Sequence, residues 1–337
     1  MPQTSQEIKG LGKKQTLYVE KVGIVARIRL LVEWKCEVTE EEKSIFNNGF
    51  PWRLLPQIAI ESNGVTGIIS CSALALEARR RRIYRNPVSA ILENPKKIEE
   101  GGKVKKEVIK GKFVVEIPIA HDMESLIGAL LAQNEETSLS VTLQWANEEE
   151  LQHTGKLAKL EGEVKWSTTV FSIGTAPIGK QEVTILPDLS AFHGLLESET
   201  PCVGNGNKKA NLIRTSGQLL CIGAAFQNGL TKELSPAVWL KFALEYGGNK
   251  DPLVWEPASE LLELNADEYD GAIAVGVGGA TEKLHYLFVD QEADNPSRDM
   301  IVPEQLTEFR AVFGLGAEAI EANANMIVTQ ETLYPAV

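Results

Sequence analysis

Residues 113–147, FVVEIPIAHDMESLIGALLAQNEETSLSVTLQWAN, combine strand and helix patterns within one short stretch. Residues 113–119 and 139–145 are rich in apolar and β-branched side chains, and the second segment alternates apolar with polar positions as a half-buried strand does. Between them, residues 122–133 contain good helix formers, and Asp122 is a suitable N-cap. This stretch predicts two strands separated by a short helical insert.

The strand pattern recurs along the whole chain, with turn signals such as Asn48-Gly49 and Asn228-Gly229 between segments. Regular alternation of strands with helices is absent, and so is any sequence repeat at the 20–50-residue scale that marks solenoids. Residues 72–82 predict a helix, and the charged residues 95–112 predict an exposed loop. Further strands are expected over residues 24–35, 54–61, 162–173, 179–186, 211–226, 239–246, 271–277, 283–290, 308–315 and 325–329. An all-β sandwich or barrel with short helical inserts, used twice, fits this pattern.

The length of 337 residues also favours two domains. Pro187-Asp188 marks the expected boundary, which predicts a flexible N-terminal arm over residues 1–16, a first domain over 17–186 and a second over 187–337. Apolar residues make up 43% of the chain, which is typical of a folded protein. No apolar run approaches the ~18 residues of a membrane-spanning helix.

The charge is unevenly distributed. The net charge is −12, and this sum divides into +7 over residues 1–120 and −19 over residues 121–337. The acidic balance disfavours nucleic-acid binding by the bulk surface, whereas the basic N-terminal third could face an anionic surface or a neighbouring subunit. The candidate assembly or membrane-facing residues are Lys9, Lys13, Lys14, Arg79, Arg80, Arg81, Arg82 and Arg85.

The sequence contains no pattern that is typical of a catalytic, cofactor or metal site. The four histidines lie at least 32 positions apart, so the clustered HxH of cupin-type metal enzymes is missing. The four cysteines form no CxxC pair, and a GxSxG nucleophile motif is absent. Carboxylates are abundant, but sequence alone cannot place two of them across a cleft, so glycoside hydrolysis stays open as an alternative.

Several stretches resemble the double jelly-roll major capsid proteins of tailless, membrane-containing icosahedral phages, the tectivirus type. The similarity is carried by residues 113–147, where a strand ending at Pro118 precedes the segment SLIGALLAQ and a second strand leads to Trp145-Ala146-Asn147. Three shorter stretches follow the same order as in that family, namely VGIV at 22–25, ILPDLS at 185–190 and residues 211–229.

The resemblance implies two jelly rolls side by side, and a homotrimer of pseudo-hexagonal outline that tiles an icosahedral shell over an internal membrane. It implies a virion protein assembled in the host cytoplasm, without enzymatic activity or cofactor. The expected partners are its own copies, neighbouring trimers, penton or minor capsid proteins and the internal viral membrane, with no sequence-specific nucleic acid.

An alternative function is a β-sandwich protein that binds a receptor or carbohydrate at the virion or cell surface. Such a protein needs an exposed aromatic platform. The candidate residues are Trp34, Trp52, Trp145, Trp166, Trp239 and Trp255, of which four lie in strand patterns and are expected in the core.

Overall fold

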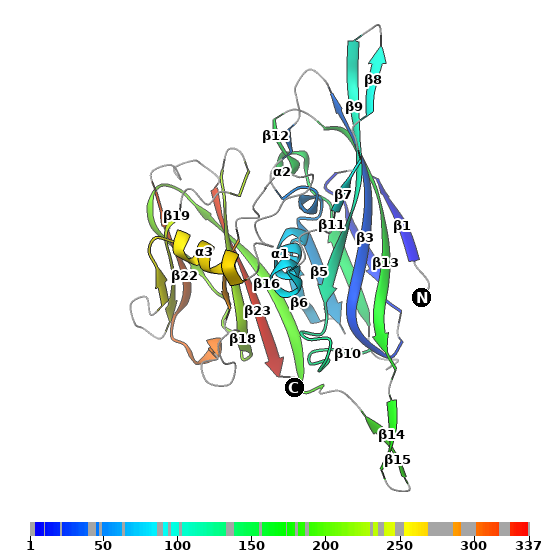
Figure 1. The fold of residues 1–337 in the computed structure, drawn as a ribbon, viewed down its shortest axis with the longest axis vertical. Helices are drawn as coiled ribbons and strands as arrows, with labels where there is room; N and C mark the ends of the chain where they lie inside the picture. The colour runs from blue at the N-terminus through cyan, green and yellow to red at the C-terminus, as the bar shows by residue number, and fades with distance from the viewer. Residues whose placement is uncertain are drawn as a thin grey trace.

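A computed structural model shows two β-sandwiches side by side, with helix α1 (Ala73–Tyr84) between them (Figure 1). The structure describes residues 4–9, 11–20, 22–39, 45–46, 49–62, 65–85, 90–93, 96–100, 103–132, 138–154, 157–172, 174–178, 181–185, 189–229, 232–234, 239–246, 253–268, 286–290, 301–316 and 324–335. Within these ranges, no helix is long and apolar enough to cross a membrane.

The outer sheet of the first roll is antiparallel and runs in the order β1-β13-β3-β9-β7, with β10 on β3 and β8 on β9. Along its long central strand, Ile28, Leu30 and Val32 are buried, whereas the intervening Arg29 is exposed, which is the alternation of a sheet with one covered face. Its strands are β1 (Thr4–Lys9), β3 (Ile24–Thr39), β7 (Ala90–Leu92), β8 (Lys96–Glu100), β9 (Lys103–Pro118), β10 (Leu130–Leu131) and β13 (Leu157–Phe171).

A second sheet, here called the shared sheet, runs through both rolls in the order β2-β11-β5-β6-β16-β23-β18-β21. Its two halves join where β6 and β16 pair in parallel, and this pairing consists of Leu195 with Ile69 and Leu196 with Ser70. Its strands are β2 (Lys14–Tyr18), β5 (Gln57–Ser62), β6 (Val65–Cys71), β11 (Leu139–Gln144), β16 (Ala191–Cys202), β18 (Gln218–Gln227), β21 (Leu287–Asp290) and β23 (Ala324–Pro335).

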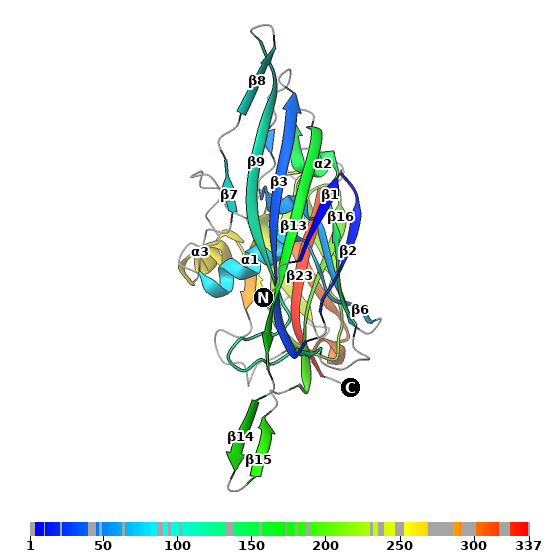
Figure 2. The ribbon, with the colours of Figure 1, turned by 90° about the vertical axis from the view of Figure 1, so that its right-hand side faces the viewer.

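The outer sheet of the second roll has the order β17-β22-β19-β20, and helix α3 (Ser259–Glu268) contacts its edge strand β20 and strand β21 of the shared sheet (Figure 1). Its strands are β17 (Gly206–Asn211), β19 (Trp239–Tyr246), β20 (Leu253–Trp255) and β22 (Phe309–Leu315). The remaining elements are β4 (Ile45–Phe46), η1 (Trp52–Leu54), α2 (Glu148–Leu151), β12 (Gln152–Thr154), β14 (Gly174–Ile178), β15 (Gln181–Ile185) and η3 (Pro303–Gln305). Figure 2 shows the β8–β9 and β14–β15 hairpins projecting at opposite ends of the long axis.

Each roll has its own hydrophobic core between two sheets. Trp52, Trp145 and Phe113 are fully buried in the first core, and Phe226 and Phe313 in the second. Strand β23 separates the two cores, because alternate side chains face opposite sides of a strand. Met326 and Val328 belong to the second core, whereas Ile327 belongs to the first. The opposite face of β23 is therefore available to helix α1.

The all-β class and the helix expected over residues 72–82 are confirmed. The helix expected over residues 122–133 is wrong, because Leu126 and Gly128 have positive φ values of 57° and 83°, which interrupt a right-handed helix. The Asp122 carboxylate still accepts two backbone N–H groups, but at a turn. The loop expected over residues 95–112 is also wrong, since most of these residues form the paired strands β8 and β9.

The N-terminal segment differs from the flexible arm expected over residues 1–16. Strand β1 pairs with β13 over six residues, and β2 pairs with β11 over five. Polar composition suggested an arm, but backbone hydrogen bonds at the edge of a sheet do not require apolar side chains. The boundary expected at residue 187 and the strand expected over 271–277 lie outside the described residues.

Candidate functional site at the seam between the rolls

Helix α1 forms one wall of the seam, which we define as the contact between the first roll and strands β16 and β23 of the second. Ser72 is its N-cap, and the Ser72 hydroxyl accepts the N–H of Ala75 at 3.1 Å. The N–H of Ser72 itself donates to the Glu197 carboxylate of β16 at 2.6 Å. The start of the helix is thus tied to the second roll.

Two arginines of α1 form ion pairs within the helix with Glu77. The Arg80 and Arg81 Nε atoms lie 2.8 and 2.7 Å from the Glu77 carboxylate oxygens, at the i,i+3 and i,i+4 spacings that bring side chains together. The Arg81 side chain is 0% exposed, and its guanidinium lies 5.1 Å from the centre of the Trp52 ring. Burial lowers the pKa of Arg81, although Glu77 opposes that shift.

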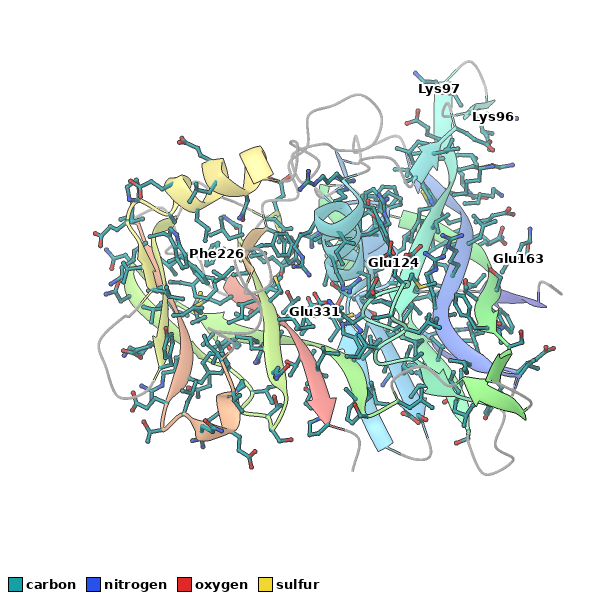
Figure 3. The ribbon with its side chains drawn as sticks, turned by 60° about the horizontal axis from the view of Figure 1, so that its bottom comes forward. Lys96, Lys97, Glu124, Glu163, Phe226 and Glu331 are labelled. Carbon is teal, nitrogen blue, oxygen red and sulfur yellow. The ribbon has the colours of Figure 1, made fainter. Side chains whose placement is uncertain are left out.

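The first and last arginines of the run, Arg79 and Arg82, reach across the seam to Glu331 of β23. The Arg79 Nε donates to Glu331 Oε1 at 2.7 Å, and the Arg82 guanidinium donates to Oε2. Glu331 is 2% exposed and lies between the rolls in Figure 3. Burial alone would raise the pKa of this carboxyl group, but Arg79 and Arg82 hold it well below its ordinary value. Glu331 therefore stays ionised and fastens α1 to the second roll.

Two histidines complete the Glu331 cluster. His193 of β16 directs Nδ1 at the Pro118 carbonyl oxygen and Nε2 at Glu331 Oε1, both at 2.9 Å, and the His121 Nδ1 lies 3.3 Å from the same oxygen. Both partners of His193 are acceptors, so only the doubly protonated ring donates to both. Burial lowers the pKa of His193 despite the neighbouring Glu331. Raising the pH therefore leaves the ring with a single proton, so that only one of the two contacts keeps its donor.

His121, His193 and Glu331 have the residue types of a metal site, and their ligand atoms lie within 4.8 Å of one another. The electrostatics oppose a cation here, because both Glu331 oxygens already accept from guanidinium groups. A divalent ion would have to displace an arginine and would be repelled by both. The cluster is therefore better suited to holding two rolls together than to binding metal.

A second polar group of the seam surrounds a cavity of about 170 Å³. Glu197 and Glu199 of β16 and Glu150 of α2 line this cavity and also an adjacent one of about 250 Å³. Arg53 of η1 and Tyr286 lie in the wall of the first cavity. Tyr286 is 1% exposed, and no described residue hydrogen-bonds to its hydroxyl.

The groups around this cavity have shifted pKa values. Burial raises the pKa of Glu197 to about 7, and burial together with the charge of Glu150 raises the pKa of Glu199. Burial lowers the pKa of Arg53 to about 10. Glu197 is half-buried and Glu199 is exposed at the mouth, so the cavity communicates with solvent.

The basic residues singled out in the sequence fall into two groups. Arg79, Arg81 and Arg82 are buried, and Arg80 is half-buried, which differs from the assembly or membrane-facing position expected for them. A run of four arginines is accommodated inside the protein because Glu77 and Glu331 supply the opposite charge. Arg85, Lys13 and Lys14 are exposed, and Lys9 ends β1.

Most of the seam could not have been found from local sequence patterns. Glu331 lies 249 positions from Arg82, and nothing near it in the sequence marks it as buried.

The two cavities are smaller than the ~300 Å³ at which ligand pockets begin, which does not favour the glycosidase alternative. Trp34, Trp52 and Trp145 are buried, so they cannot form an exposed aromatic platform. Trp166 and Trp255 are half-buried.

No protein-family model matches the chain, and no curated protein sequence matches it. Solved structures do. The STIV major capsid protein is similar with a TM-score of 0.64 and 10% identity, over 99% of this chain and 97% of that chain. The atomic structure of Sulfolobus turreted icosahedral virus gives a TM-score of 0.61 at 9% identity, over 99% and 90%.

The mavirus major capsid protein gives a TM-score of 0.51 at 10% identity, over 98% of this chain and 87% of that chain. At these identities, the likeness establishes the fold. The chain has the double jelly-roll fold that is found in these viral major capsid proteins, as the sequence resemblance predicted.

Proposed function

We propose that the chain is a coat subunit of an icosahedral virion, in which homotrimers tile the shell over an internal membrane. The observation that carries this proposal is the coverage of the structural likeness, since 99% of the chain aligns with 97% of the STIV major capsid protein. Both rolls and the connection between them are therefore included. Three copies of a two-roll chain present six similar sandwiches, which suits a tile with hexagonal neighbours.

A closed trimer needs two different surfaces that fit each other, because the same contact between subunits repeats head to tail around the ring. Large exposed apolar side chains occur on both rolls. Ile91 and Leu92 of β7 are 55% and 38% exposed on the first roll. Leu240, Val254 and Leu264, on adjoining elements of the second roll, are 58%, 42% and 59% exposed. We assign these two groups to the two opposing surfaces of the contact between subunits of the trimer.

The exposed basic residues are assigned to contacts formed on assembly. Lys9 ends β1, Lys13 directly precedes β2, Lys14 is the first residue of β2, and Arg85 follows α1. Lysines at such a position would attract an anionic lipid surface or an acidic neighbour, with a strength that falls as salt rises. Penton or minor capsid proteins and the internal membrane are the proposed partners, and neither catalysis nor a cofactor is part of this function.

Light scattering on the purified chain tests the proposal first. The expected mass is three times 36.9 kDa, and electron microscopy of the assembled material should show facets built of hexagonal tiles. A strict monomer at about 100 μM that forms no particles would count against a coat function and would favour the receptor- or carbohydrate-binding alternative, to be tested on glycan arrays.

Two variants test the assigned contact between subunits separately from the coat function. Val254→Asp with Leu264→Asp should abolish the trimer without changing the melting temperature of the monomer, because both side chains are exposed in the single chain. Val203→Asp, at a residue that is 65% exposed outside both apolar groups, serves as the control and should leave the trimer intact. A double variant that remains trimeric would exclude this surface from the contact between subunits.

A further inference from the structure

The junction between the two halves of the shared sheet lies next to Glu197. The two halves of the shared sheet are joined only by the pairs Leu195–Ile69 and Leu196–Ser70 among the described residues, and Glu197 follows directly. Opposite it, Ser72 begins helix α1 and donates its N–H to the Glu197 carboxylate at 2.6 Å. A change in charge at Glu197 therefore acts where both sheet pairing and helix capping cross the seam.

The surroundings of Glu197 disfavour a negative charge. Glu150 and Glu199 line the same two cavities. Burial is the largest influence on the pKa of Glu197 and raises it, the hydrogen bonds from the Ser72 N–H and hydroxyl lower it, and the charge of Glu199 raises it. The lining of the larger cavity contains these three glutamates and no lysine or arginine. Arg53 and Lys232 border only the smaller cavity, and Arg53 partly offsets the repulsion.

We infer that the seam is a proton-controlled joint between the two rolls, closed while Glu197 carries a proton and loosened when that proton is lost. In the closed state, the neutral carboxyl group accepts the N–H of Ser72 and adds no charge beside Glu150 and Glu199. Loss of the proton to solvent leaves a half-buried carboxylate beside Glu199, and the need to solvate this charge, together with its repulsion from Glu199, then draws water between β6 and β16. This inference concerns the single chain and does not depend on the proposed coat function.

Titratable groups from several elements surround Glu197. The groups that face it or share its cavities are Arg53 on η1, Cys71 on β6, Glu150 on α2, Glu199 on β16, Lys232 and Tyr286. His193 lies on the same strand but contacts Glu331, so its titration affects the other half of the seam. Burial raises the pKa values of Cys71 and Tyr286 well above their ordinary range, so these two groups keep their protons where Glu197 titrates.

Hydrogen exchange of the full-length chain at pH 6 and pH 8 tests the inference, after correction for the intrinsic pH dependence of exchange. Amides of β6 and of residues 195–200 should exchange at least threefold faster at pH 8 in the natural sequence. Glu197→Gln, which cannot ionise, should show the slow exchange of pH 6 at both pH values. The matched control, Glu93→Gln, removes an exposed carboxylate and should behave like the natural sequence.

A second measurement avoids the risk that the variant fails to fold. Carboxyl NMR of the natural sequence should show Glu197 titrating with a midpoint near 7. A midpoint near the ordinary glutamate value of 4.5 would overturn the inference, and so would a pH response that persists unchanged in Glu197→Gln. A response that is halved in the variant would also overturn the assignment to a single group, because His193 would then supply the rest.

Discussion

The Arg82 guanidinium of α1 and the Glu331 carboxylate of β23 form a buried ion pair between two rolls, although 249 positions separate them in the sequence. Arg79 binds the other oxygen of the same carboxylate, so one glutamate pairs with two guanidinium groups. The run of arginines is thus an internal fastening, and its strength depends on Glu331 more than on any single arginine.

Glu331→Gln should strongly destabilise the protein. The amide keeps the size of the carboxylate but leaves two buried guanidinium groups without their anion, which costs about 3–5 kcal/mol of unfolding free energy. Urea denaturation followed by tryptophan fluorescence measures the loss. Glu304→Gln, at an exposed position, is the control and should change stability by less than about 0.5 kcal/mol. Equal midpoints for the two variants would show that the ion pair contributes nothing.

Zinc should not stabilise the chain through His121, His193 and Glu331. The guanidinium groups that already occupy the Glu331 oxygens would repel a divalent cation, so the melting temperature should be the same with Zn²⁺ and with a chelator. A Zn²⁺-dependent rise in melting temperature that disappears in His193→Ala would contradict the electrostatic argument and identify a metal site.

The stability of the chain should decline on both sides of mildly acidic pH, for two separate reasons. The folded-state pKa of Glu331 lies well below its ordinary value of 4.5, so its contribution is present above pH 4.5 and is lost as the pH falls. The folded-state pKa of Glu197 is raised from 4.5 to about 7, so its contribution is present below pH 4.5 and is lost as the pH rises to 7.

Because Glu197 is half-buried and partly solvated, the free energy of unfolding that is lost as the pH rises to 7 is on the order of 1–2 kcal/mol. Denaturation curves at pH 4, 5, 6, 7 and 8 measure both effects. Glu197→Gln should flatten the decline between pH 5 and pH 8 while leaving the acid side unchanged. A natural sequence whose stability rises steadily from pH 5 to pH 8 would contradict the assignment.

Local signals in the sequence were sufficient for the elements, but not for the seam. Strands such as β3 were predictable because apolar and polar residues alternate over many positions, and Ser72 was a recognisable start for α1. The destination of the four arginines was not, since exposure is the rule for arginine unless a partner is present. That partner, Glu331, comes from the last strand, and only the path of the chain brings it to α1.

Gly128 supports His193 through its lack of a side chain. It forms a bridge with Phe192 at a φ of 83°, and a Cβ atom there would lie 2.8 Å from the backbone nitrogen of His193. Gly128→Ala should therefore cost about 2–4 kcal/mol, from the left-handed backbone together with the clash. Gly206→Ala isolates the backbone effect, because Gly206 has a φ of 85° with nothing within 4 Å, and should cost about 1 kcal/mol. Equal losses in the two variants would show that the His193 contact is unimportant.

The β14–β15 hairpin should be dispensable for folding of the single chain. Its two strands pair only with each other among the described residues and form a sheet of their own beyond the body of the molecule (Figure 1). Gly174 and Ile185 are directly paired, so their Cα atoms lie about 5 Å apart and a short Gly-Ser link can replace residues 174–185 without moving the flanking chain. The melting temperature of this deletion should stay within about 1 °C of the natural value, because the hairpin has no strand pairing with the rest of the described chain.

Removing the edge strand β17 provides the contrasting case. Ala210 of β17 is 0% exposed and belongs to the second core, and the strand pairs with β22 over six residues. Its deletion should prevent cooperative unfolding of the second roll. If removing the β14–β15 hairpin were equally damaging, the hairpin would have to pack against the body of the chain. If the melting temperature is unchanged, as expected, but the deletion variant no longer forms particles, the hairpin contacts a neighbouring copy. Such a contact would stabilise the hairpin, since a two-stranded sheet is only marginally stable alone.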